Sequence, residues 1–98
     1  MALRIIVKPP ATQDVEDAVA WYYKENVRVA EKFLFEFYDA VRALSSAPLR
    51  FQKRYKDIRA CALKRFPYNI FYFVEKETLF VIAVLHQKRN PVLWKSRR

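Results

Sequence analysis

The chain has 98 residues, and its 19 Lys and Arg against 10 Asp and Glu give it a formal net charge of +9 at pH 7. It contains no glycine, which excludes the glycine-rich loops that bind phosphates and dinucleotides. One cysteine and one histidine cannot build a disulfide framework or a structural zinc site, and we expect no cofactor. Because 53% of the residues are hydrophobic and 16% aromatic, we expect a single folded domain over residues 1–98.

The first elements in the chain are predicted to be a short strand and a helix. Residues 3–8 are rich in β-branched side chains, which is typical of a strand, and Pro9 and Pro10 would end it. For the helix over residues 11–25, Thr12 is the expected N-cap and Asn26 the expected stop. Acidic residues 14, 16 and 17 would lie where the helix dipole favours negative charge.

A second helix is predicted over residues 28–46, closed by Pro48. Its apolar side chains recur every three or four positions, as on the buried face of a helix: Val29, Phe33, Phe37, Val41 and Leu44. The short connection predicts an antiparallel helical hairpin, and the aromatic stripe predicts that it packs against a sheet.

The second half of the chain is predicted to supply the sheet. After a basic loop over residues 50–56, strands are expected at residues 58–66, 68–75 and 78–86. Without glycine, the turn at residues 76–77 is expected to be longer or based on a type I turn. Residues 87–98 form a basic tail with Pro91 and Trp94 as anchors. The predicted fold is α+β, β-α-α-β-β-β, with the helical hairpin on one face of a mainly antiparallel four-stranded sheet.

The second face of this sheet is predicted to be too apolar to lie bare in water. Strand 68–75 places Phe71 and Phe73 on the face opposite Tyr68, Ile70 and Tyr72. In strand 78–86, strict alternation would put residues 79, 81, 83 and 85 on one face and 80, 82 and 84 on the other, both apolar. Two helices can cover only one face. The second must be covered by the basic tail or by a partner chain.

The positive charge is concentrated in the second half, since residues 50–98 carry 13 basic and 3 acidic side chains. Such a field attracts polyanions and acidic proteins, although a basic cluster can also be a solvated surface. The longest apolar run, residues 79–85, is too short to span a membrane, and no secretory signal is recognisable. We therefore expect a cytoplasmic protein.

Few catalytic constellations fit these residues. Seven of the ten acidic side chains lie in the helical half, and Cys61 is expected to be a small core residue. What remains is metal-independent RNA cleavage through the 2′-hydroxyl, which needs a base, an acid and cations. Side chains of the right types are Tyr55, Lys64, Arg65, His86, Lys88 and Arg89. His86 ends an apolar strand, however, and a hydrogen bond to backbone is the favoured explanation of it.

Two segments resemble the RelE/ParE toxin superfamily. One is the run Asp-Ile-Arg-Ala-Cys-Ala-Leu-Lys-Arg-Phe-Pro-Tyr-Asn-Ile-Phe-Tyr at residues 57–72, and the other is residues 83–94, which end in His-x-x-Arg-x-Pro-x-x-Trp. Residues 21–23 and 48–51 fit as well. The resemblance implies the toxin of a type II toxin–antitoxin module, bound in a hetero-oligomer by an acidic antitoxin whose flexible region adds a helix or strand to the toxin.

The resemblance also divides the function in two. RelE-like members cleave mRNA on the ribosome, whereas ParE-like members inhibit DNA gyrase and are not nucleases. The Phe66-Pro67-Tyr68 turn and the tail look ParE-like. Lys64 falls where the nucleases carry a catalytic Arg, and Lys88 falls close to a second one. Trp94 stands where they carry a tail Tyr, and an indole cannot exchange a proton as a phenol does.

The sequence therefore favours a ParE-like toxin that acts by binding gyrase over an enzyme. The residues expected to contact the target or partner are basic and aromatic: Arg59, Lys64, Arg65, His86, Lys88, Arg89 and Trp94. The first alternative is a ribosome-dependent, metal-independent mRNA endonuclease that uses Lys64, Arg65, His86, Arg89 and Tyr55. The second is a decayed toxin that only binds antitoxin.

Overall fold

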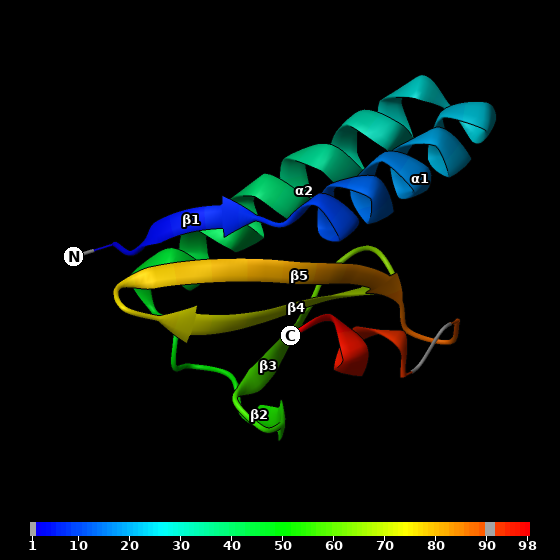
Figure 1. Ribbon diagram of the computed structural model, residues 1–98. Helices are drawn as coiled ribbons and strands as arrows, with labels where there is room; N and C mark the ends of the chain where they lie inside the picture. Colours follow the sequence, from blue (N-terminus) through cyan, green and yellow to red (C-terminus); the bar gives the residue numbers. More distant parts are fainter. Residues whose placement is uncertain (1, 90–91) are drawn as a thin grey trace.

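The computed structural model describes residues 2–89 and 92–98, and it shows two helices packed on a mixed sheet (Figure 1). The elements are β1 (Arg4–Val7), α1 (Pro9–Glu25), α2 (Val27–Ser46), β2 (Lys53–Tyr55), β3 (Ile58–Ala62), β4 (Tyr68–Glu75), β5 (Thr78–His86) and the 3-10 helix η1 (Leu93–Arg97). The strands are ordered β1-β5-β4-β3-β2, with β1 parallel to β5 and the other pairs antiparallel. The predicted α+β class is confirmed. The sheet has a fifth strand, because part of the expected basic loop pairs with β3 as β2.

The start of α1 differs from the prediction. Pro9 is the first helical residue and Lys8 the N-cap, so the prolines begin the helix as well as ending the strand. Proline is tolerated there because the first-turn N–H groups have no partner inside a helix. Thr12 instead lies within the helix, where its N–H donates to the Lys8 carbonyl at 3.0 Å. No acidic side chain lies in the first turn, so the expected helix-dipole contacts are not made there.

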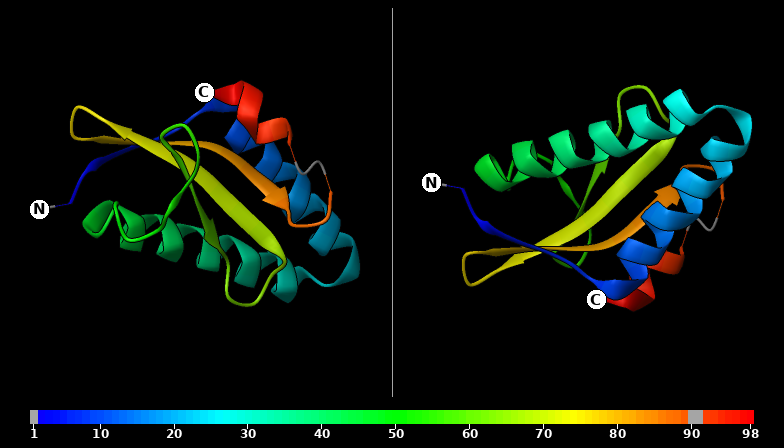
Figure 2. Two further views of the ribbon diagram at one scale, coloured as in Figure 1. Left: turned by 90° about the horizontal axis from the view of Figure 1, so that it is seen from below. Right: turned by 90° about the horizontal axis from the view of Figure 1, so that it is seen from above.

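Asn26 connects the two helices by itself, which confirms the hairpin. Its N–H donates to the Tyr22 carbonyl at the end of α1, and its side-chain oxygen accepts from the Arg28 N–H at 2.8 Å. One residue therefore caps both helices. Seen from above in Figure 2, α1 and α2 converge at this connection and diverge toward β1.

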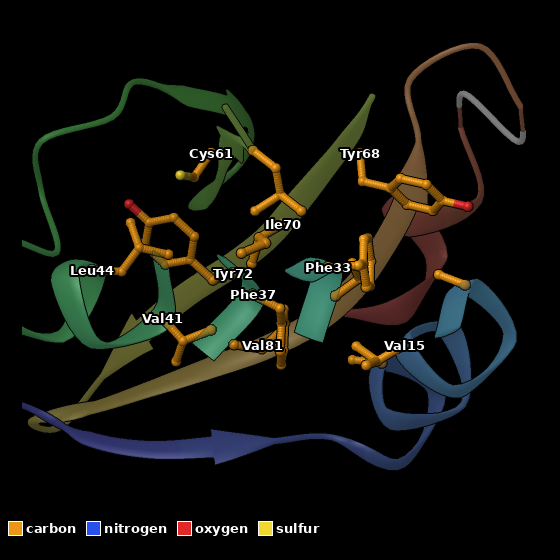
Figure 3. Packing of buried hydrophobic residues seen from close by; sticks show 14 of the residues in the cluster. Val15, Phe33, Phe37, Val41, Leu44, Cys61, Tyr68, Ile70, Tyr72 and Val81 are labelled. Carbon is orange, nitrogen blue, oxygen red and sulfur yellow. The ribbon is translucent and has the colours of Figure 1, made fainter. Parts of the chain in front are cut away.

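The main core lies between the sheet and the helices, as predicted (Figure 3). Phe33 and Phe37 of α2 are buried there, and the Phe33 ring packs edge-on against Tyr68 with centroids 5.1 Å apart. The alternation of β4 holds, since Tyr68, Ile70 and Tyr72 all face this core. The alternation predicted for β5, with residues 79, 81, 83 and 85 on one face, is wrong. Its register shifts opposite Phe71 and Tyr72, and such a bulge reverses the two faces beyond it. Val84 consequently faces the helices, and Ala83 and Leu85 face the other side.

Two turns also differ from the prediction. The β4–β5 hairpin turns through Lys76 and Glu77 alone, with φ of 48° and 64°. Positive φ at both positions matches the twist of a two-residue hairpin, so the tight turn forms here without glycine. β3 ends at Ala62 instead of residue 66. The chain then leaves the sheet in a wide turn, whose Leu63 N–H donates to the Tyr68 carbonyl at 2.9 Å.

The chain's own tail covers the second face of the sheet, in the red segment of Figure 1. Trp94 is 6% exposed and stacks on Phe71 with ring centroids 4.5 Å apart. The Arg98 guanidinium lies 3.6 Å from the centre of the Phe73 ring and pairs with Asp57 at 2.6 Å. Of the two covers that the sequence left open, the tail is the one observed. Pro91, the other expected anchor, lies outside the described residues.

Asp14 and Arg97 fasten this tail to the edge of β5. β1 pairs with β5 only as far as Val81, so the next backbone groups of β5 lack a neighbouring strand. Asp14 accepts from the Val84 N–H at 3.0 Å, and Arg97 donates to the Ile82 carbonyl at 3.2 Å. The two side chains also form an ion pair at 2.5 Å, and both are mostly buried. They therefore satisfy the backbone where β1 ends.

Candidate functional site

Lys64 and Arg65 lie in the wide turn between β3 and β4, which is held against α2. The Glu36 carboxylate accepts from the Lys64 N–H at 2.5 Å and from the Arg65 N–H at 3.1 Å. Both side chains are exposed. Because the backbone of the turn is fixed by a carboxylate from α2, the two cations are presented at a defined position beside that helix.

Beside them lies Phe35 of α2, which is 72% exposed. It borders a hollow of about 400 Å³ that Lys64, Arg65 and Lys32 also line. Neither Phe35 nor Glu36 was singled out from the sequence. The sequence did contain a signal for Phe35, because this aromatic residue lies outside the apolar face predicted for the second helix. Phe35 becomes part of a candidate site only because the turn that carries Lys64 and Arg65 folds beside it.

His86 and Arg89 follow the end of β5 and border a different hollow, of about 330 Å³. His86 Nδ1 accepts from the Lys88 N–H at 3.1 Å, and the ring packs edge-on against Tyr68 at 5.3 Å. Burial, followed by the charges of Arg89 and Lys88, lowers the pKa of His86. The imidazole is therefore neutral at pH 7. The Arg89 guanidinium lies 5.4 Å from the centre of the Trp21 ring.

Tyr55, Arg59 and Trp94 lie toward the opposite end of β3. Tyr55 contacts Trp94 edge-on at 6.2 Å, and Lys95 lies 5.2 Å from the Tyr55 ring. Arg59 Nη1 donates to the Phe51 carbonyl at 2.5 Å. The Trp94 indole is covered by the sheet, and the Arg59 guanidinium holds the preceding loop. In this conformation both side chains are engaged within the chain itself.

The structure thus divides the residues that the sequence grouped together. Lys64, Arg65, His86, Lys88 and Arg89 share one end of the sheet, where the Gln87 N–H donates to the Pro67 carbonyl at 2.8 Å. Tyr55 and Arg59 lie toward the other end, where β2 pairs with β3. Within residues 2–89 and 92–98, no cluster of three His, Cys, Asp or Glu side chains could hold a metal ion. No described helix is long and apolar enough to cross a bilayer.

An apolar groove of about 710 Å³ lies between α1, α2 and the end of β1. Figure 2 shows the divergence of the helices that accompanies it. Its walls are mostly apolar: Val7, Val15, Val19, Ala20, Tyr23, Leu34, Phe37 and Tyr38, with Thr12, Glu16 and Lys24 at its polar positions. Phe37, which the sequence assigned to the core, therefore also borders an open apolar channel. We call this the hairpin groove.

The fold is that of several solved toxins. The protein of a chromosomal ParDE toxin–antitoxin system from P. aeruginosa superposes with a TM-score of 0.77 at 15% identity, over 87% of this chain and 96% of that one. An E. coli RelE double mutant in the free state gives 0.67 at 17% identity, over 99% and 94%. A chain of the RelBE2 toxin–antitoxin complex from Mycobacterium tuberculosis gives 0.58 at 20% identity, over 88% and 99%. No curated protein matches the sequence.

These likenesses show that the chain shares the fold of those structures. The family model for the ParE toxin of type II toxin–antitoxin systems matches residues 5–91. The chain therefore belongs to the ParE toxin family of type II toxin–antitoxin systems, within the RelE/ParE superfamily that the sequence predicted.

Proposed function

We propose that this toxin inhibits DNA gyrase by binding it, and that an acidic antitoxin neutralises it by filling the hairpin groove. The observation that carries the first part is the separation of Tyr55, one of the two candidate acids or bases of RNA cleavage, from the cations that cleavage would need. Tyr55, a candidate acid or base, lies toward the opposite end of the sheet from Lys64, Arg65 and Arg89. His86 lies with those cations but is engaged by the Lys88 N–H. A binding function needs no such assembly.

The hairpin groove supports the antitoxin part of the proposal. Its walls are apolar and open to solvent, and its volume suits the apolar side chains of an amphipathic segment. The whole chain has a net charge of +9, carried by its second half, so an acidic partner is attracted at long range, and the groove would hold it by apolar contact at short range. An antitoxin segment that is disordered when free would fold on this groove.

Gyrase inhibition is tested with purified toxin in a supercoiling assay on relaxed plasmid, with and without the antitoxin encoded by the neighbouring reading frame. We expect supercoiling to be lost with toxin and restored at equimolar antitoxin. Undiminished supercoiling at a large molar excess of toxin would contradict the proposal. Growth arrest after induction, with an SOS response and intact mRNA, is the matching result in cells.

One observation favours the ribosome-dependent mRNA endonuclease as the second candidate. Four of the five residues of the predicted nuclease set, Lys64, Arg65, His86 and Arg89, lie at the same end of the sheet. Primer extension on mRNA from induced cells separates the two functions, because cuts at defined codon positions would support cleavage. A chain that binds antitoxin but leaves growth, supercoiling and mRNA unchanged would be a decayed toxin.

A further inference from the structure

The surface around Phe35 combines an exposed aromatic ring with unpaired positive charge. Phe35 is 72% exposed, more than any other large apolar side chain in the part of the chain that the structure describes. Lys32, one turn of α2 away, and Lys64 and Arg65, from the turn that Glu36 holds, line the hollow beside it. We call these four residues the Phe35 surface. The aromatic ring and Arg65 are of the residue types enriched at protein interfaces, and the two lysines add positive charge around them.

Positive charge exceeds negative charge at this hollow, because three cations line it with two carboxylates, and Asp39 is paired with Arg42. The Glu36 carboxylate accepts the two backbone N–H groups of the turn, and Asp39 forms an ion pair with Arg42. Within residues 2–89 and 92–98, no ion pair involves the side chains of Lys32, Lys64 or Arg65. The chemistry that fits is therefore an acidic polypeptide segment that places an apolar side chain against Phe35.

The Phe35 surface is continuous with the hairpin groove. Leu34 and Tyr38 line the groove and also line a smaller hollow of about 200 Å³ beside Phe35. An antitoxin segment that fills the groove therefore covers two residues at the border of the Phe35 surface. By contrast, the hollow at His86 and Arg89 shares no lining residue with the groove.

An antitoxin neutralises a toxin directly when it sterically excludes the target, and contiguous surfaces allow such an overlap. We propose that the Phe35 surface is where this toxin holds its target, through an acidic segment of the target protein that carries an apolar side chain. Antitoxin in the hairpin groove then blocks the target by covering Leu34 and Tyr38. This inference rests on the proposed function in so far as the chain must be an active toxin.

The test uses two variants of the Phe35 surface and two matched controls. Phe35→Ser removes the ring, and the double variant Lys64→Glu with Arg65→Glu reverses the charge. Leu49→Ser changes another apolar residue that is 67% exposed but lies outside the surface, and Lys53→Glu with Arg54→Glu reverses two exposed charges on β2. For each full-length protein we would measure growth arrest at equal expression, gyrase inhibition, antitoxin affinity by calorimetry and the melting temperature.

We expect both variants of the Phe35 surface to lose toxicity by about tenfold or more, as for a hot-spot residue. The antitoxin affinity of Phe35→Ser should stay within about threefold of the wild type, since the groove itself is unchanged, and that of the charge-reversed variant should stay within about threefold of the charge-reversed control, which has the same net charge. The controls should match the wild type in every measurement. Full toxicity of Phe35→Ser and of the charge-reversed variant would overturn the inference. So would a parallel loss of antitoxin affinity, because the surface would then belong to the antitoxin.

The failure of the proposed function gives a different pattern. If the wild type arrests growth while supercoiling stays normal, gyrase is not the target. The growth assay then still decides whether Phe35 holds the target that exists. If the wild type does not arrest growth at all, the proposed function and this inference fall together.

Discussion

Tyr72 is a single residue that buries a polar group in the core with a hydrogen-bond partner. Its side chain is fully buried among the residues of Figure 3, and its hydroxyl donates to the Pro48 carbonyl at 2.7 Å. Burial raises the pKa of Tyr72 to about 12, an effect that the nearby charge of Arg59 only partly offsets. The phenol is therefore held in its neutral form well above the pH at which it would ionise in the unfolded chain.

This raised pKa predicts a loss of stability at high pH. A group whose pKa is raised by folding contributes its full stabilisation below the unfolded value of 10.0 and loses it as pH rises toward the folded value of about 12. We expect the free energy of unfolding to fall by an amount on the order of 2 kcal/mol over this window. Urea titrations from pH 9 to 12 measure it, and Tyr72→Phe should flatten that part of the curve. An unchanged curve for that variant would contradict the assignment.

Asp14 is the residue whose role changed most between sequence and structure. By position it was expected to complement the dipole of its own helix. It instead binds Arg97 and the Val84 N–H, although Arg97 lies 83 positions further along the chain. Removing one partner of a mostly buried pair leaves the other charge uncompensated.

We therefore expect Asp14→Asn to destabilise the fold by about 3 kcal/mol. Chemical denaturation measures this, with Asp17→Asn as the matched control on an exposed position of the same helix. Because the pair anchors the tail, backbone amides of residues 93–97 should also exchange faster in the Asp14 variant. Equal stability of the two variants would show that the Arg97 contact does not fasten the tail.

Among the elements, the β4–β5 hairpin has a turn whose backbone conformation is unfavourable for the residues that form it. Lys76 and Glu77 both adopt positive φ, a region in which a Cβ atom meets the backbone. Strong pairing on both sides explains why the turn forms: β4 and β5 are paired from Tyr68↔His86 to Glu75↔Thr78. The long pairing of β4 with β5 outweighs the preference of Lys76 and Glu77 for negative φ.

Relieving this turn should stabilise the protein. We expect Glu77→Gly to raise the free energy of unfolding by about 1 kcal/mol, because glycine adopts positive φ without a steric cost. For a domain of this size, such a gain raises the melting temperature by about 4–8 °C. Glu75→Gly is the matched control, and it should lower the melting temperature because it weakens a strand. A lower melting temperature for Glu77→Gly would refute the claim of strain.

For the molecule as a whole, the decisive feature is that its sheet is covered on both faces. The helices cover one face, and Trp94, Arg97 and Arg98 close the other. The helical hairpin, by contrast, leaves apolar surface open at the hairpin groove and at the Phe35 surface. This is why we place both protein partners there.

Opening the tail should expose the second face of the sheet. We expect Trp94→Ala to cost about 3–5 kcal/mol, as for a buried aromatic side chain, and to promote self-association. Trp21→Ala, at a position that is 52% exposed, should cost at most about 1 kcal/mol. Thermal unfolding and light scattering on both variants measure these effects. A monomeric Trp94→Ala protein of wild-type stability would contradict the role of the tail as a cover.

The sequence by itself determined the two helices, four of the strands and the existence of two apolar sheet faces. These features follow from periodicity and from single residues such as Asn26, whose effects reach only a few positions along the chain. It also carried the resemblance to the toxin superfamily, through motifs that are local in the chain.

Only the tertiary structure decided what covers the second face, where β5 reverses its faces, and which functional residues come together. Each of these depends on groups far apart in sequence, such as Asp14 with Arg97, or Glu36 with the turn at Lys64. A contact of this kind exists only when the elements between its partners have a definite arrangement, and a local pattern does not contain that arrangement.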